Sequence, residues 1–108
     1  MGRDRKAEEA SEEQPVRAGS WTFMTNHAHV LFCLAQDPGV RLREVAERVG
    51  ITERAVQRIV SDLQEGGYLE VTKEGRRNRY RVLDHLPLRH DVERHRTVAE
   101  LLDLICSD

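Results

Sequence analysis

A set of polar side chains recurs at helical spacing near the middle of the chain, and their chemistry suits the edges of DNA bases. An arginine can donate two parallel hydrogen bonds to the O6 and N7 atoms of guanine, and a glutamine can form a matching pair with adenine. A serine, or a threonine at a helix N-terminus, can contact a phosphate group. The candidates for nucleic-acid binding in this segment are Thr52, Arg54, Gln57, Arg58 and Ser61.

The residues around this set predict two short helices joined by a tight turn. Ala46 is small at the position where two such helices cross, and Gly50 can take the positive φ angle that the turn requires. Val56 and Ile59 lie one turn apart on the inward side of the second helix. Residues 42–61 therefore have the pattern of a helix-turn-helix with the polar set on its outer face. Taken alone, two arginines four residues apart also fit an ordinary solvated helix face.

A second basic segment follows and alternates in the manner of a β-hairpin. Residues 68–73 are rich in strand formers, a five-residue connection containing Gly75 comes next, and residues 79–82 resume the strand pattern. Positive charge at a hairpin tip suits the narrow minor groove of DNA, where negative potential is concentrated. The alternative is that the charge only protects a strand edge from aggregation. The candidates for nucleic-acid binding here are Arg76, Arg77, Asn78 and Arg79, although the asparagine can also serve the turn alone.

Composition divides the 108 residues into one small domain with an addition at each end. Residues 1–20 are charged and polar, so we expect a disordered tail there. Residues 21–84 hold the folded domain, and residues 85–108 hold a last helix whose apolar stripe must bury against something. The periodicity of apolar residues predicts helices at about 26–36, 43–49, 53–65 and 91–106.

The charge distribution is more informative than the net charge of −2. Residues 41–81 hold ten basic and seven acidic residues, whereas residues 82–108 hold three and six. A phosphate backbone responds to such a local excess rather than to the average. No apolar run approaches the roughly 20 residues of a membrane span, and no signal peptide is visible. We therefore expect a cytoplasmic protein without a membrane partner.

The order of helix, short extended piece, helix-turn-helix and hairpin resembles bacterial and archaeal transcriptional regulators of the MarR and ArsR type over residues 25–83. The segment that carries the resemblance is LREVAERVGITERAVQRIVSDLQEGGYLEVTKEGRRNRYRV. It implies an α+β, mostly helical fold. This is a winged helix-turn-helix with a three-helix core, a two- to three-stranded wing and an extra C-terminal dimerisation helix.

The same resemblance implies a function and a partner. We expect a homodimer that binds double-stranded DNA in a sequence-specific manner and regulates transcription. The recognition helix, about 53–65, would enter the major groove, and the Arg-rich wing, 73–81, would contact the minor groove or the backbone. Dimerisation would use the apolar stripe of the last helix, namely Val98, Leu101, Leu102 and Ile105.

Two alternatives concern binding rather than a different fold. A winged helix can also act as a protein-interaction module, and the modest local charge leaves this open. A metal-responsive sensor of the ArsR kind would need histidine, cysteine and carboxylate ligands. The candidates, His27, His29, Cys33, His90, Glu93 and His95, lack a diagnostic spacing, so we predict no metal site.

Other chemistries find little support. A redox sensor would require an exposed thiol with a lowered pKa at Cys33 or Cys106, and neither cysteine has a basic neighbour in sequence. The chain contains no nucleophile motif, phosphate-binding glycine loop or metalloenzyme signature. We therefore predict no catalytic residues, no enzyme activity and no cofactor. The sequence does not identify a small-molecule effector.

Overall fold

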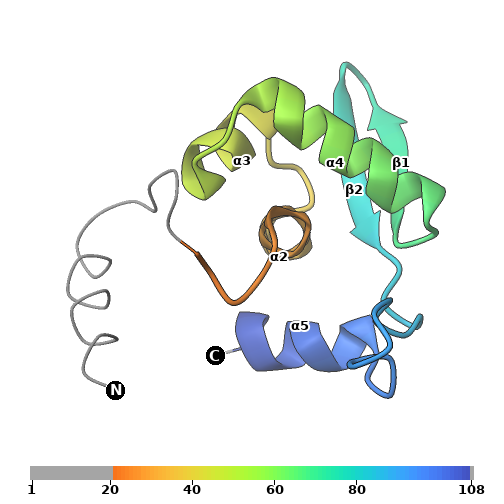
Figure 1. Cartoon of the computed structure of the whole chain (residues 1–108). Helices are drawn as coiled ribbons and strands as arrows, with labels where there is room; N and C mark the ends of the chain where they lie inside the picture. The colour runs from red at the N-terminus through yellow and green to blue at the C-terminus, as the bar shows by residue number, and fades with distance from the viewer. Residues whose placement is uncertain (1–20, 108) are drawn as a thin grey trace.

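The computed structural model describes residues 21–107, so the predicted disordered tail, residues 1–20, lies outside the described part. Figure 1 shows α2 at the centre, with α3, α4 and a hairpin on one side of it and α5 on the other. Within residues 21–107, every helix is too short or too polar to span a lipid bilayer. The elements are α2 (Asn26–Gln36), α3 (Leu42–Val49), α4 (Glu53–Glu65), β1 (Leu69–Glu74), β2 (Arg77–Val82) and α5 (Val98–Cys106).

The predicted mostly helical α+β fold is confirmed, with a wing of two strands. α2 and α4 begin and end where the sequence predicts, because local signals are strong at both starts. The Thr25 hydroxyl accepts a hydrogen bond of 3.2 Å from the N–H of Ala28, and the Thr52 hydroxyl accepts one of 3.0 Å from Ala55. Gly50 ends α3 with a φ of 87°, which places the tight turn where the glycine allows it.

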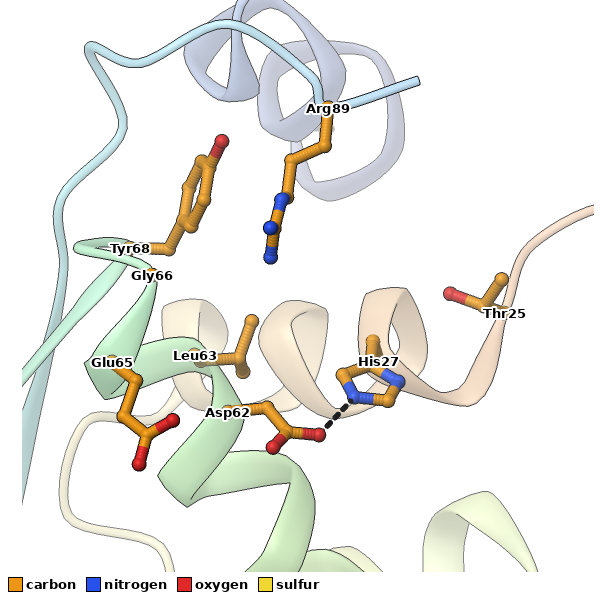
Figure 2. Close-up of a pocket in the computed structure, with 8 residues that line it drawn as sticks. All are labelled: Thr25, His27, Asp62, Leu63, Glu65, Gly66, Tyr68 and Arg89. Carbon is orange, nitrogen blue, oxygen red and sulfur yellow. Dashed lines mark hydrogen bonds and ion pairs between the residues drawn. The ribbon is translucent and has the colours of Figure 1, made fainter.

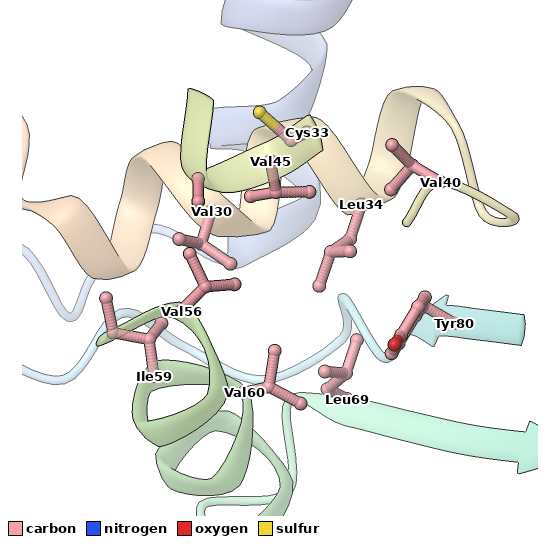
Figure 3. Close-up of a cluster of buried hydrophobic side chains, with 11 residues drawn as sticks. Val30, Cys33, Leu34, Val40, Val45, Val56, Ile59, Val60, Leu69 and Tyr80 are labelled. Atoms are coloured by element: carbon pink, nitrogen blue, oxygen red, sulfur yellow. The ribbon is translucent and has the colours of Figure 1, made fainter. Parts of the chain in front are cut away.

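α2 is buried on two sides. Val30 and Leu34 are fully buried on the side that faces α4 and the hairpin (Figure 3). Leu31 and Phe32 are buried as well, but they do not belong to the main hydrophobic cluster around Val30 and Leu34. Among the described helices that contact α2, the one not represented in that cluster is α5. α5 therefore covers the second side. The main cluster consists of Val30, Cys33, Leu34, Val40, Val45, Ala46, Val56, Ile59, Val60, Leu69 and Tyr80.

The hairpin is longer, and its turn tighter, than the sequence predicts. The strands pair out to Glu74 and Arg77, so the turn consists of Gly75 and Arg76 rather than five residues. Gly75 has a φ of 66°, and no described non-glycine residue has a positive φ, so the signs are those of a type II′ turn. Because this turn matches the twist of the flanking strands, pairing continues to the tip. Asn78, predicted for the tip, consequently lies within β2.

The prediction of a last helix from about residue 91 is wrong, because α5 begins at Val98. The preceding residues form a loop closed by a backbone hydrogen bond of 2.9 Å from the Leu88 N–H to the Arg96 carbonyl. A capping box then starts the helix. The Thr97 hydroxyl accepts from the Glu100 N–H, and the Glu100 carboxylate accepts from the Thr97 N–H. Residues 91–95 form turns inside this closed loop, and the bridge between Pro87 and Thr97 places the cap where α5 starts.

The apolar stripe of α5 is largely covered within the chain. Val98 is 2% exposed, and Leu101 and Leu102 are half-buried, because α5 packs against α2. Val98, predicted as a dimerisation residue, is therefore placed in the interior and is not available to a partner. Near the end of the helix the surface is different, since Leu104 is 77% and Ile105 is 42% exposed.

Truncation in the core at the centre of the fold should be costly. Leu34→Ala removes a fully buried side chain from α2, and we expect the free energy of unfolding to fall by about 2–5 kcal/mol. Urea denaturation followed by circular dichroism measures this as a lower midpoint with an unchanged slope. Val92→Ala, at a position 76% exposed, is the matched control and should change stability by less than about 0.5 kcal/mol. Equal midpoints for the two variants would contradict this core.

The start of α5 should depend on pH. The backbone N–H of Thr97 and the guanidinium of Arg96 both donate to the Glu100 carboxylate, at 2.9 and 2.8 Å, and they hold its pKa below the ordinary value. A lowered pKa in the folded state stabilises the cap above the pKa of the unfolded chain. The stabilisation is lost as the pH falls through the lowered pKa of the folded state. The Cα chemical shifts of residues 98–101 should therefore move toward coil on acidification.

Glu100→Gln is the control for this titration. Glutamine can still accept the Thr97 N–H bond but does not ionise, so the acid-dependent shift change at the start of α5 should be absent. An unchanged titration in the glutamine variant would assign the effect to another group.

Candidate nucleic-acid interface

The outward face of α4 carries all the candidates that the sequence predicts there. Arg54, Arg58 and Ser61 are exposed and lie on the side of the helix opposite its buried residues, within about 60° of one another at 3.6 residues per turn. Gln57 is exposed at the flank of this line, and Thr52 is exposed at the N-cap. The buried side that fixes this orientation consists of Val56, Ile59 and Val60.

The wing, residues 69–82, separates its candidates between the turn and the two faces of the sheet. Arg76 lies in the turn, and Arg79 projects from the outer face, where it is opposite Thr72. Asn78 belongs to the other face, because side chains alternate along a strand. Arg76 and Arg79 are exposed, and no salt bridge or side-chain hydrogen bond to a described residue engages either of them.

Two wing arginines on the outer face are already engaged. Arg81 forms a salt bridge of 2.9 Å with Glu70, directly opposite on β1. Arg77 donates from its guanidinium to the carbonyl oxygen of Gly39, at 2.8 Å. Both side chains are exposed, but each has a partner within the chain. The sequence predicts one basic tip. In the structure Arg77 and Arg81 are bonded within the chain, whereas Arg76 and Arg79 have no such bond to a described residue.

Figure 1 shows that α4 and the hairpin turn lie on the same side of the molecule, whereas α5 lies on the opposite side. We call the first side the basic face and define it by its four exposed arginines. Three acidic residues of α4 lie on or beside it. Glu53 stands in the first turn, where a carboxylate stabilises the helix N-terminus. Asp62 follows Arg58 by four residues and is bonded to His27, and Glu65 follows Ser61 by four residues at the C-terminal end. The residues of the basic face are Arg54, Arg58, Arg76 and Arg79.

Sequence reasoning overlooked two arginines at the start of α3. Arg41 is the N-cap residue of this helix and Arg43 lies in its first turn, and both are exposed. In a helix-turn-helix, the first helix crosses the phosphate backbone while the second enters the groove. The signal was present in the sequence as Arg-Leu-Arg, which spans the N-cap and the first two residues of α3.

An open hollow of about 570 Å³ lies apart from the basic face, at the C-terminal end of α4 (Figure 2). On its floor the His27 ring and the Asp62 carboxylate are joined at 2.8 Å, and both side chains are about half exposed. Arg89 extends into the hollow from the segment before α5. The charges are mixed in sign, so the hollow does not continue the positive surface. Its lining consists of Thr25, His27, Asp62, Leu63, Glu65, Gly66, Tyr68 and Arg89.

Three of the histidines considered for metal binding have hydrogen-bond partners within the described part of the chain, and one of these is His27, which is bonded to Asp62. Among residues 21–107, no three histidine, cysteine or acidic side chains gather closely enough to hold a metal ion. His29 is hydrogen-bonded to Asn26 within α2, and His90 accepts a bond from the backbone of Val92. Burial raises the pKa of the Cys33 thiol, outweighing the opposite effect of Arg48, so this cysteine lacks the thiolate character of a redox sensor.

Comparison with known proteins agrees with this geometry. Residues 26–70, from the start of α2 into β1, match a family described as winged helix-turn-helix DNA-binding. Together with the two-stranded hairpin that it enters, this segment has the fold of a winged helix-turn-helix. No curated protein matches the chain at a significant level.

Two solved structures align with the winged helix-turn-helix and with further parts of the chain. The zinc-dependent MarR family regulator AdcR, in its Zn(II)-bound state, aligns with a TM-score of 0.51 and 20% identity over 95% of this chain and 69% of that one. The PcaV transcriptional regulator from Streptomyces coelicolor, in complex with its natural ligand, aligns with a TM-score of 0.48 and 28% identity over 74% of this chain. The present chain spans 57% of the PcaV chain.

The predicted resemblance to MarR-type regulators is thus confirmed for the fold. The matching family is described as DNA-binding.

Proposed function

We propose that this protein is a MarR-like transcriptional regulator that binds duplex DNA in a sequence-specific manner as a homodimer. The observation that carries the proposal is the line of exposed Arg54, Arg58 and Ser61 on α4, held outward by the buried side of the same helix. The tight turn at Gly50 and the cap at Thr52 hold this helix at the surface. A helix presented in this way fits the major groove, which is about 12 Å wide.

The polar groups of α4 then divide by chemistry. Arg54 and Arg58 can each donate two parallel hydrogen bonds to a guanine, and Gln57 can pair with an adenine. Ser61 and the N-terminus of α4 at Thr52 can contact phosphates, which fixes the register of the helix. Sequence preference would therefore arise from the three long side chains.

The wing and α3 add contacts that do not depend on sequence. Arg76 belongs to the hairpin turn, which lies on the same side of the molecule as α4, and Arg79 projects from the outer face of β2. Neither guanidinium has a salt bridge or side-chain hydrogen bond to another described residue. They are placed to meet a minor groove or the backbone beside the site that α4 occupies. Arg41 and Arg43 at the start of α3 would contact phosphates on the other side of that site. Asn78, on the opposite face of the wing from Arg79, is a weaker candidate.

The dimer would form through the far side of the molecule. Leu104 and Ile105 are exposed near the end of α5, beside the half-buried Leu101 and Leu102. An apolar patch of this kind is costly in water and is covered when a second copy packs against it. Because α5 and the basic face lie on opposite sides, both can be occupied at once.

A protein-interaction module is the second candidate function. The acidic residues Glu53, Glu70 and Glu74 lie on or beside the same surface and would weaken a purely electrostatic attraction to DNA. The effect of two of them is limited by geometry, since Glu70 is paired with Arg81 and Glu53 occupies a helix N-terminus. Glu74 stands opposite Arg77 beside a turn that also carries Arg76. These arrangements favour DNA as the partner.

Selection of bound duplexes from a random-sequence pool tests the proposed function. We expect the wild-type chain to enrich a two-fold symmetric sequence. Arg58→Ala should lose about 1–3 kcal/mol on that sequence and relax the preference at one base pair of each half-site. Arg79→Ala should weaken binding on all sequences and reduce the salt dependence by about one phosphate contact per copy.

Arg94→Ala supplies the matched control for these variants. It removes the same charge from the loop before α5, where Arg94 pairs with Asp91, and should leave DNA binding unchanged. A wild-type chain that enriches no duplex, or an Arg58→Ala variant indistinguishable from Arg94→Ala, would refute the proposed function.

The dimer is tested by charge placed on the exposed end of α5. Leu104→Glu and Ile105→Glu should shift the protein from dimer to monomer in sedimentation equilibrium, because a buried unpaired carboxylate opposes association. Asp103→Asn, exposed on the same helix, should leave the mass unchanged. A wild-type chain that sediments as a monomer at micromolar concentration would contradict the dimer.

A further inference from the structure

One wing arginine has a different role from its neighbours. Arg77 is the first residue of β2, directly beside the turn, and its guanidinium donates to the Gly39 carbonyl at 2.8 Å. The two residues are 38 positions apart in the chain. Three residues further along β2, the Tyr80 N–H donates to the Pro38 carbonyl at 2.9 Å. Two consecutive carbonyls of the loop between α2 and α3 thus hold one edge of the wing.

The outer half of the wing has little else to hold it in place. Its base is anchored because Leu69 and Tyr80 are buried in the core. Residues 72–79 are all exposed, so no apolar side chain fixes the outer half. A two-stranded hairpin without a packed face is only marginally stable in water. Among residues 21–107, the Arg77 guanidinium makes the one side-chain hydrogen bond between this outer half and the body of the protein.

We propose that Arg77 is a positioning residue, which ties the outer half of the wing to the loop between α2 and α3 and so sets where Arg76 and Arg79 meet DNA. The proposal rests on the proposed function for the meaning of this position. A wing that is held before binding loses less conformational entropy when it docks. The affinity that Arg76 and Arg79 contribute to DNA binding consequently depends on the hydrogen bond from Arg77 to the Gly39 carbonyl.

Amide hydrogen exchange of the protein without DNA tests whether the bond from Arg77 to Gly39 holds the outer half of the wing. Arg77→Ala should speed amide exchange in residues 72–79 by about tenfold, because a charge-assisted hydrogen bond is lost. Arg79→Ala, on the same face of β2 and without a partner, is the matched control and should leave exchange unchanged. Arg77→Lys keeps a cationic donor that can reach the carbonyl, and it should restore part of the protection. Equal exchange in the Arg77→Ala and Arg79→Ala variants would overturn the proposal.

A mutant cycle on the selected duplex separates positioning from direct contact. We expect Arg77→Ala to weaken binding by about fivefold to tenfold in the wild-type background. In the double variant Arg76→Ala, Arg79→Ala it should weaken binding by less than about twofold, because the wing then has no contacts to misplace. Equal losses in both backgrounds would show that Arg77 contacts DNA itself and would overturn the proposal. A wild-type chain that binds no duplex would refute the proposed function, while the exchange experiment would still decide whether the tie exists.

Discussion

The structure depends on the burial of α2 on two sides. One side of the helix buries Val30 and Leu34, and the other side buries Leu31 and Phe32. Two separate parts of the protein therefore pack against the same helix. On the first side it supports the helix-turn-helix and the base of the wing. On the second side it receives α5. Because both packings use one rigid helix, the basic face and the exposed end of α5 are held in a fixed relation.

Local signals explain why the recognition helix could be predicted so closely. Thr52 caps α4, Gly50 provides the positive φ of the turn, and a regular apolar spacing turns one side of the helix inward. Each signal depends on residues within one or two turns of the chain. The exposure of Arg54, Arg58 and Ser61 follows from the same spacing, so their common face could be derived before the structure was known.

Three of the errors concern contacts between residues that are separated in the sequence. The start of α5 is delayed because Leu88 pairs with Arg96 across a loop, and no local periodicity reveals that closure. The stripe on α5 was assigned to a partner, but Val98 is buried within the chain because α5 packs on α2. The wing arginines were treated as one group, and only the bond from Arg77 to Gly39, 38 residues away, separates them. The side-chain types predict that the arginines can bind phosphates and bases. Tertiary contacts determine which of these arginines are already bonded within the chain.

This division between free and engaged arginines bears on how a protein with a net charge of −2 can act on a polyanion. Electrostatic attraction depends on where charge lies, and here unpaired guanidinium groups gather on α4 and in the outer half of the wing. Glu70 neutralises Arg81 near the base of the wing, away from the turn. The acidic excess of residues 82–108 lies in and around α5, on the opposite side of the molecule from the basic face. The fold therefore places the acidic excess of residues 82–108 away from the basic face, where Glu53 and Glu74 stand beside the arginines.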